Sequence, residues 1–389
     1  KYLWPVRGST MPSMATAGAV MPSALNEKGA PVDSAAGKRQ ALQVMTGGVN
    51  DYGQLGDGTV AERSAFRAVN GLETVLKASA GVEHAVAIKE DGSVWAWGRN
   101  NWGQLGNGTT ADSRNAVAVK NLKRVIDVAA GMYHTVAVQS DGSVWAWGRN
   151  SSGQLGNNSG KDSDVPVQVS GISGVVKVAA GMYHTVALKS DGTVWAWGRN
   201  SSGQLGDGSV TDKSSPVQVA SLSGVAGITA GAHHTVAVKS DRTVWAWGWN
   251  VNGMLGDGTR TDRSEPVQVK GVEGISDVSA GQNHTLALKS DGTIWAWGGN
   301  EFGQLGGRPA DGSIASKIEG IAGVKQLSAG MHHSAAVMWS GALWVWGRDQ
   351  KNTPPKQSPV RVPDIQDIGE VSAGKYYSVL LIQRKSAAK

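Results

Sequence analysis

The chain has 389 residues, with 54 glycines and 16 tryptophans but two phenylalanines and no cysteine. The lack of cysteine excludes disulfide bonds, thiolate metal sites and cysteine nucleophiles, and no apolar run approaches the ~18 residues of a membrane-spanning helix. The formal charge of +6 comes from residues 1–40 and 384–389, so the body between them is neutral. A neutral body argues against nucleic-acid binding, because phosphate binders concentrate positive charge on their folded surface.

Residues 1–40 precede the repetitive part of the chain and are rich in Ala, Ser, Met and Pro. This composition is typical of a tail that has no packed core of its own. We predict an N-terminal extension here, either a tail or a docking segment. Its residues 2–6 are candidates for self-association with a second subunit, and residues 384–389 form a basic C-terminal tail.

Two tracts recur between residues 41 and 383. One is Val-Trp-Ala-Trp-Gly, which occurs four times and recurs with small changes as Ile-Trp-Ala-Trp-Gly and Leu-Trp-Val-Trp-Gly. The other is Ala-Gly-x-x-His, whose histidines are 50 residues apart four times and then 49; a last copy, 44 residues further on, has Tyr377 at this position. A period of about 40–50 residues with several short strands per unit is typical of propeller blades.

The third full repeat shows how one unit predicts four strands. Residues 175–179 are apolar and β-branched, whereas residues 165–169, 184–189 and 193–197 alternate in polarity. Gly, Asn, Asp or Pro bound each segment, and an Asp-Gly pair before residue 193 predicts a hairpin turn. We therefore expect an all-β fold of four-stranded blades.

The tryptophans are explained by this fold. Alternate residues of a strand share a face, so both indoles of Trp-Ala-Trp project one way and the small residues project the other way. Sheets about 10 Å apart fill the gap between them best when large side chains meet small ones. We expect these tryptophans to be structural: Trp95, Trp97, Trp145, Trp147, Trp195, Trp197, Trp245, Trp247, Trp295, Trp297, Trp344 and Trp346.

The repeated histidines are also predicted to be structural. Equivalent residues of neighbouring blades lie about 10 Å apart, which is too far for shared zinc coordination at roughly 2.0–2.1 Å. We expect each histidine to bond a backbone group beside the tight Ala-Gly turn. The members of this set are His84, His134, His184, His234, His284 and His333.

Counting the tracts gives seven blades in a closed ring. The first Trp-type tract is degenerate, with Met45 and Gly47 at the Trp positions. This predicts an underfilled gap for which Trp4 or a methionine of the extension is a candidate. The chain enters at a third strand and leaves after a second strand, so both chain ends form the closing blade and no open edge remains. The predicted blades are 73–122, 123–172, 173–222, 223–272, 273–321, 322–365, and 366–383 with 41–72.

The repeat resembles the regulator of chromosome condensation repeat family. The loop Gly-Arg-Asn-Asn-Trp-Gly-Gln-Leu-Gly-Asn-Gly, the later Pro-Val-x-Val and the Ala-Gly-x-x-His-Thr tract carry the resemblance over residues 41–383. The resemblance implies the seven-bladed fold but not one function. Relatives include nucleotide-exchange factors, a plant ultraviolet-B photoreceptor and a propeller-type β-lactamase inhibitor. The photoreceptor's Trp and Arg before the histidine are missing here, and so is the exchange factors' wedge insertion.

Function is expected where the copies differ. The two positions before each repeated histidine vary most, and all seven pairs should emerge at one face of the ring. These positions include Tyr, Met and His, and such a composition resembles the aromatic-rich composition of protein interfaces. The predicted partner-binding residues are Glu83, Met132, Tyr133, Met182, Tyr183, His233, Asn283, Met331, His332 and Tyr376, with Tyr52, Trp102 and Phe302 as second-rank loop sites.

No Ser/His/Asp set, carboxylate pair or phosphate-binding motif stands out from the repeats. We therefore expect no enzyme, no catalytic residues, no cofactor and no metal. The leading hypothesis is a protein-interaction propeller, exported or displayed at the cell surface of a bacterium and assembling through its extension. The alternatives are an intracellular guanine-nucleotide-exchange or chromatin-binding relative, and a protein inhibitor of a secreted enzyme.

Overall fold

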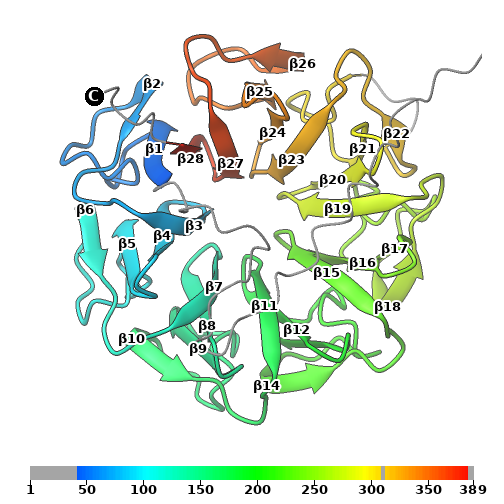
Figure 1. The fold of residues 1–389 in the computed structure, drawn as a ribbon. Coiled ribbons are helices and arrows are strands. Elements are labelled where there is room, and N and C mark those ends of the chain that lie inside the picture. Colours follow the sequence, from blue (N-terminus) through cyan, green and yellow to red (C-terminus); the bar gives the residue numbers. More distant parts are fainter. Residues whose placement is uncertain (1–41, 308–311, 384–389) are drawn as a thin grey trace, which may run out of the picture. The chain divides into compact units, whose positions relative to one another are not determined.

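The computed structural model describes residues 42–307 and 312–383, and within these residues the chain forms 28 β-strands and no helix (Figure 1). The strands form blades around a central channel, and the predicted all-β, seven-bladed propeller is confirmed. Predictions for residues 1–40 and 384–389 fall outside the described residues. The part of the chain that is described has no helix that could cross a membrane.

Six blades follow one another along the chain, each made of four consecutive antiparallel strands. The first three contain β3 (Val75–Ala80), β4 (His84–Lys89), β5 (Val94–Gly98) and β6 (Ser113–Ala118); β7 (Val125–Ala130), β8 (His134–Gln139), β9 (Val144–Gly148) and β10 (Ser163–Gln168); and β11 (Val175–Ala180), β12 (His184–Lys189), β13 (Val194–Gly198) and β14 (Lys213–Gln218). The next three contain β15 (Val225–Ala230), β16 (His234–Lys239), β17 (Val244–Gly248) and β18 (Arg263–Gln268); β19 (Ile275–Ala280), β20 (His284–Lys289), β21 (Ile294–Gly298) and β22 (Ser316–Lys317); and β23 (Val324–Ala329), β24 (His333–Met338), β25 (Leu343–Gly347) and β26 (Lys356–Arg361).

Both ends of the described chain build the closing blade, as predicted. It contains β27 (Ile368–Ala373), β28 (Tyr377–Gln383), β1 (Leu42–Gly48) and β2 (Arg63–Ala68). Strands β28 and β1 pair from Leu42 opposite Gln383 to Gly48 opposite Tyr377, so seven residue pairs join the two ends. A single bridge between Leu42 and Val75 also connects this blade to the first blade.

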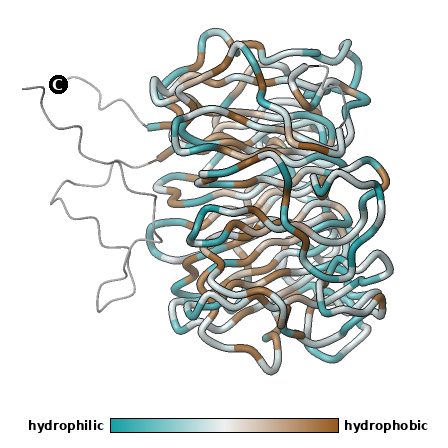
Figure 2. Tube along the Cα trace, turned by 90° about the vertical axis from the view of Figure 1, so that its right-hand side faces the viewer, coloured by the Kyte–Doolittle hydropathy of each residue, from teal (hydrophilic) through white to brown (hydrophobic). Residues whose placement is uncertain are grey.

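Large side chains of one blade meet small side chains of the preceding blade. Trp197 is fully buried and shares a core cluster with Val136 and Ala146. Its indole Nε1 donates to the backbone oxygen of Gln154, 2.9 Å away. The second Trp of each pair is fully buried, whereas Trp195 and its equivalents are half-buried. Hydrophobic segments lie mostly inside the ring when it is seen edge-on (Figure 2).

The degenerate position at Gly47 is filled by a side chain from the same blade. The ring of Phe66 lies against Gly47, where an added Cβ would be 3.2 Å from it. Phe66 and Met45 both pack on the core cluster of this blade interface. The expected vacancy therefore does not exist at Gly47, because Phe66 on β2 fills it.

The repeated histidines bond across blades rather than within their own turn. His84 Nε2 lies 2.9 Å from the Thr135 hydroxyl of the next blade, and that hydroxyl donates to the Gln104 backbone oxygen at 2.9 Å. Because the hydroxyl's one proton is used, His84 Nε2 carries the proton in this contact. The expected backbone partner was wrong: a side chain 51 residues away fills this role, and five further histidines repeat the pattern with Thr185, Thr235, Thr285, Ser334 and Ser378.

The interface between the closing blade and the first blade uses different residues. Tyr377 takes the histidine position, and its hydroxyl donates toward the backbone oxygens of His84 (2.5 Å) and Gly81 (3.1 Å). Ala85 takes the threonine position, so it offers no hydroxyl to a partner. The longer phenol reaches the backbone directly, and this explains why the two exceptions occur at the same interface.

Side chains of the preceding blade cap the inner edges of the blades. The innermost strand of each sheet has backbone amides directed away from the sheet, and such amides need partners. The Ser79 hydroxyl accepts from the amide of Ala130 at 3.1 Å, and four equivalent hydroxyls cap four further blades. Ala129 and Ala179 occupy this position in the other two blades, so no described side chain caps the amides that follow in β11 and β15.

Replacing Ala129 with serine should supply the missing acceptor for Ala180. A net hydrogen bond contributes about 0.5–1.5 kcal/mol, so we expect Ala129→Ser to raise the free energy of unfolding by about that amount. Urea unfolding measures the change. Ala226→Ser, at an exposed position on β15, should leave stability within about 0.5 kcal/mol; equal effects of both substitutions would contradict the capping role.

Candidate functional site

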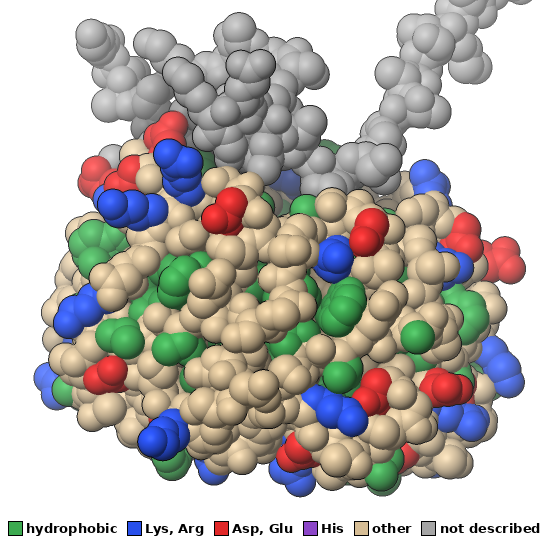
Figure 3. All heavy atoms as spheres, turned by 90° about the horizontal axis from the view of Figure 1, so that it is seen from below, with side chains coloured by type: hydrophobic (Ala, Val, Ile, Leu, Met, Phe, Trp, Pro, Cys, Tyr) green, Lys and Arg blue, Asp and Glu red, His purple; other side chains and the backbone are tan. Residues whose placement is uncertain are grey.

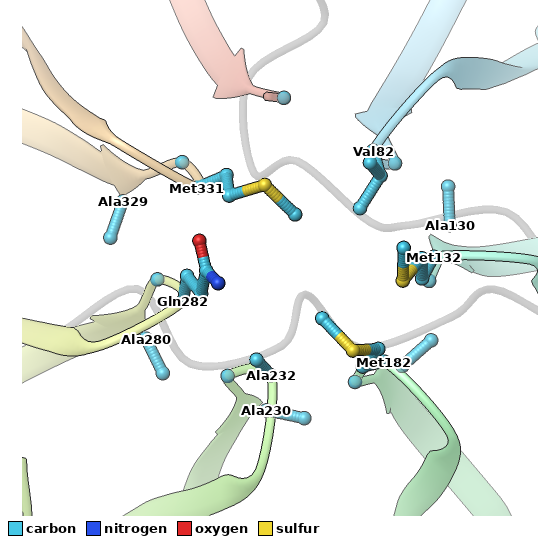
Figure 4. A pocket seen from close by; sticks show the side chains of 18 of the residues that line it. Val82, Ala130, Met132, Met182, Ala230, Ala232, Ala280, Gln282, Ala329 and Met331 are labelled. Carbon is cyan, nitrogen blue, oxygen red and sulfur yellow. The ribbon is translucent and has the colours of Figure 1, made fainter. Parts of the chain in front are cut away.

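The predicted candidate pairs lie where the innermost strands end. Strand β7 ends at Ala130, and Gly131 leads into Met132 and Tyr133 before the buried His134. The two members of each pair occupy different places. In six of the seven pairs the first member lines the central opening, as the labelled residues Val82, Met132, Met182, Gln282 and Met331 do in Figure 4. Lys375, the first member of the seventh pair, instead forms an ion pair with Glu83.

A cavity of about 110 Å³ lies at this opening and is lined by the Ala-Gly ends of all seven blades. Backbone hydrogen bonds between neighbouring blades surround it, for example from the Met132 amide to the Gly181 oxygen at 3.3 Å. Three of the residues at the rim are methionines, Met132, Met182 and Met331, whose flexible side chains adapt to differently shaped apolar partners.

The second member of each pair lies beside the residue that follows the third strand. In the third blade, the Arg199 amide donates to the Tyr183 oxygen at 2.9 Å. This approach requires Gly198, which has a φ of +103° and where a Cβ would lie 2.5 Å from that same oxygen. The glycine that ends each Trp tract therefore places two variable side chains next to each other.

We call these two sets of residues, with three loop residues, the band. The members that precede the histidine position are Glu83, Tyr133, Tyr183, His233, Asn283, His332 and Tyr376. The members that follow the third strands are Val49, Arg99, Arg149, Arg199, Trp249, Gly299 and Arg348, and the loop members are Tyr52, Trp102 and Phe302.

Five aromatic residues of the band form a continuous arc over four blades. Ring centroids are 6.3 Å apart for Trp102 and Tyr133, 6.1 Å for Tyr133 and Tyr183, 6.5 Å for Tyr183 and His233, and 5.8 Å for His233 and Trp249. These separations are in the range of favourable aromatic pairs. All five side chains are half-buried, so each keeps an accessible part.

A second, shorter cluster lies at the fifth, sixth and closing blades. Phe302 and His332 have ring centroids 4.9 Å apart in an edge-to-face arrangement, and Tyr376 lies 5.0 Å beyond His332. Arg348 covers Phe302 at 4.3 Å. Asn283 and its neighbour Gly299 separate this cluster from the arc.

Arginines cover several aromatic rings of the band. The Arg99 guanidinium lies 4.5 Å from the Tyr52 ring, and that of Arg149 lies 4.5 Å from the Trp102 ring. Arg199 lies 5.7 Å from the Tyr183 ring. Contacts of this kind hold a guanidinium plane in place while its edge stays available for hydrogen bonds.

The band has a positive excess, with four arginines and one glutamate. Glu83 is neutralised by Arg99, whose Nη1 lies 2.5 Å from it, and by Lys375 at 3.3 Å. Arg149 and Arg199 form no ion pair with any described residue. The side of the ring seen in Figure 3 differs, because lysines, arginines and acidic residues are interspersed there.

Burial keeps the ionisable aromatic side chains of the band neutral. It lowers the pKa of His332 to about 4 and also lowers the pKa of His233. Burial is the main cause of a raised pKa of Tyr133, and the neighbouring Tyr183 raises this pKa further. The charge of the band at neutral pH is therefore carried by its arginines.

One ion pair joins charged side chains of two neighbouring innermost strands. Lys77 forms an ion pair with Asp127, whose other oxygen accepts from the Val178 amide at 2.8 Å. Burial raises the pKa of Asp277 and of Glu370. Within residues 42–307 and 312–383, no three His, Asp or Glu side chains are arranged to hold a metal ion.

The structure brings together most of the predicted residues but adds others. Tyr133, Tyr183 and His233 join the second-rank Trp102, whereas Met132 and its equivalents lie at the central opening. Sequence reasoning missed the four arginines and Trp249. The signal for these residues was the variable position directly after each Trp tract. The glycine before it adopts a positive φ and thereby places this position on the same surface as the residue before the histidine.

The fold and site define a propeller built from repeats, with its variable residues gathered at one end. A model described as the RCC1-like domain matches residues 38–311, and a model of the regulator of chromosome condensation (RCC1) repeat matches residues 291–337. The chain belongs to the RCC1-like domain family. No curated protein is similar enough in sequence to match it.

Solved structures show the same fold at low sequence identity. Prp20p from Saccharomyces cerevisiae is 23% identical, with a TM-score of 0.79 over 90% of this chain and 93% of that one. Yeast RCC1 (Prp20) bound to Kap60 is 22% identical, with a TM-score of 0.81 over 99% and 97%. Human WBSCR16 is 23% identical, with a TM-score of 0.76 over 89% and 100%.

Proposed function

We propose that this chain is a non-enzymatic interaction protein that binds a protein partner through the band. The observation that carries the proposal is the arc from Trp102 to Trp249, in which accessible aromatic rings touch one another and are covered by arginines. Residues of these types dominate the binding energy of protein interfaces. Their rings lose little conformational entropy on binding, because neighbouring rings already hold them in position.

The similar propeller Prp20p is described with binding properties to Gsp1p and histones, and yeast RCC1 (Prp20) with bound Kap60. These descriptions support the use of such a ring as a protein-binding scaffold. At 22–23% identity they give no partner for this chain.

The test compares two variants in the full chain. Proteins captured from an extract of the native source by the immobilised wild type are identified, purified and titrated by calorimetry. Tyr133→Ala with Tyr183→Ala should weaken the affinity of the captured partner at least about tenfold, because truncating interface hot spots costs 2 kcal/mol or more.

The matched control is Trp339→Ala. Trp339 is 69% exposed in the turn after β24, at the end of the blade opposite the band. This substitution should leave the affinity unchanged. A partner that binds the double tyrosine variant as tightly as the wild type would overturn the proposal, provided that the variant melts within a few degrees of the wild type.

A further inference from the structure

We infer that the partner segment that contacts the band carries carboxylates, which bind the guanidinium groups of Arg149 and Arg199. The inference rests on the proposed function and adds the chemistry of the partner. It comes from hydrogen-bond donors that the described part of the chain leaves without acceptors.

Arg149 and Arg199 are held in the same way in neighbouring blades. Nε of Arg149 donates to the Ser151 hydroxyl at 3.0 Å, and Nε of Arg199 donates to the Ser201 hydroxyl at 3.0 Å. A guanidinium has five N–H donors, so four remain on each side chain. None of these four has an acceptor among the described residues.

The arginine of the first blade, Arg99, shows how a guanidinium at this position contacts a carboxylate in this fold. Arg99 donates through Nε to Asn101 at 3.0 Å and through Nη1 to Glu83 at 2.5 Å. Tyr133 and Tyr183 replace this glutamate in the next two blades, so Arg149 and Arg199 lose an internal carboxylate. A carboxylate from a partner would restore the same contact.

The geometry suits a carboxylate because the guanidinium planes are already fixed. Arg149 lies 4.5 Å from the Trp102 ring, 5.5 Å from the Tyr133 ring and 5.4 Å from the Tyr183 ring. A planar guanidinium held in this way can donate two parallel hydrogen bonds to one carboxylate. Little side-chain entropy is lost when that contact forms.

The band's charge also decides between a different protein and a second copy of this chain. A second copy that presented its own band would bring arginines against arginines, and like charges across an interface cost several kcal/mol. The methionines Met132 and Met182 line the adjoining opening (Figure 4). The segment we expect is therefore acidic, with an apolar side chain next to its acidic residues.

The probe is a library of random dodecapeptides displayed on phage and selected on the full chain. Peptides selected on the wild type should be enriched in Asp and Glu beside an apolar residue. A synthesised peptide should bind about tenfold or more weakly to Arg149→Ala with Arg199→Ala, and more weakly in 0.5 M salt. Lys123→Ala, which removes an exposed cation in the loop before β7 at the opposite end, should change nothing.

Each other outcome overturns a defined part of the argument. Peptides that require Tyr133 and Tyr183 but show no acidic enrichment would contradict this inference and leave the proposed function standing. Peptides that ignore both the tyrosines and the arginines would contradict the proposed function. Tighter binding of a DNA dodecamer than of any acidic peptide, or dimerisation lost in Arg149→Glu, would assign the arginines to nucleic acid or to a second copy and overturn the inference.

Discussion

Replacing Trp197 with alanine should lower the free energy of unfolding by about 3–5 kcal/mol, because truncating a buried aromatic residue leaves a cavity. Trp197 is 0% exposed and lies against Val136 and Ala146 of the preceding blade. The substitution also removes the indole N–H that donates to Gln154 at 2.9 Å. Most of the loss comes from packing between blades, so it affects the closure of the whole ring.

Trp195→Ala is the matched control, because it removes the same side chain two residues earlier in the same strand. Trp195 is half-buried beneath Lys189, whose Nζ is 5.8 Å from the ring, so less packing is lost. Urea unfolding of both variants measures the difference. Equal losses for the two tryptophans would show that the packing between blades does not depend on the inner indole.

Lowering the pH from 7 to 5 should destabilise the ring steeply through its six buried histidines. Burial lowers the pKa of His84, His134, His234 and His284 to about 3, that of His333 to about 4, and that of His184 well below its usual value. The unfolded chain binds these protons near pH 6.5. The folded pKa values lie below the unfolded ones, so the stabilisation is complete above pH 6.5 and is lost as the pH falls toward 3.

The size of this effect follows from the number of protons taken up on unfolding. Each histidine contributes about 1.4 kcal/mol per pH unit once the unfolded form is protonated, so the slope near pH 5 should correspond to about six protons. The pH dependence of the unfolding free energy measures it. His134→Gln with His234→Gln should reduce the count by two; a slope unaffected by this change would show that other groups govern acid unfolding.

The ring could be predicted from the sequence because each blade repeats the same complementary surfaces. Alternation places Trp197 on one face of its strand and Ala196 on the other, and a 50-residue period turns this into identical contacts between blades. The histidine partner was missed because it lies 51 residues away. The Thr that follows four of the six repeated histidines was visible in the sequence, but its link to the preceding blade depends on the stagger between blades.

The candidate site could be predicted only in part. Variation before each histidine located Tyr133 and Tyr183, but strand geometry sends the adjacent Met132 to the central opening. The arginines were missed because Arg149 is close to Tyr133 only through the backbone bend at Gly148. Contacts that depend on a positive φ at one residue are not apparent from periodicity.

The pairing of Leu42 with Gln383 means that the described chain begins and ends as neighbours in one hairpin-like ladder. A two-residue β-turn could join these ends covalently, and a new start could then be opened in a surface loop of another blade. Such a circular permutant would keep every contact between blades, including the one made by Tyr377. The architecture therefore depends on the cyclic order of the repeats and not on which repeat is synthesised first.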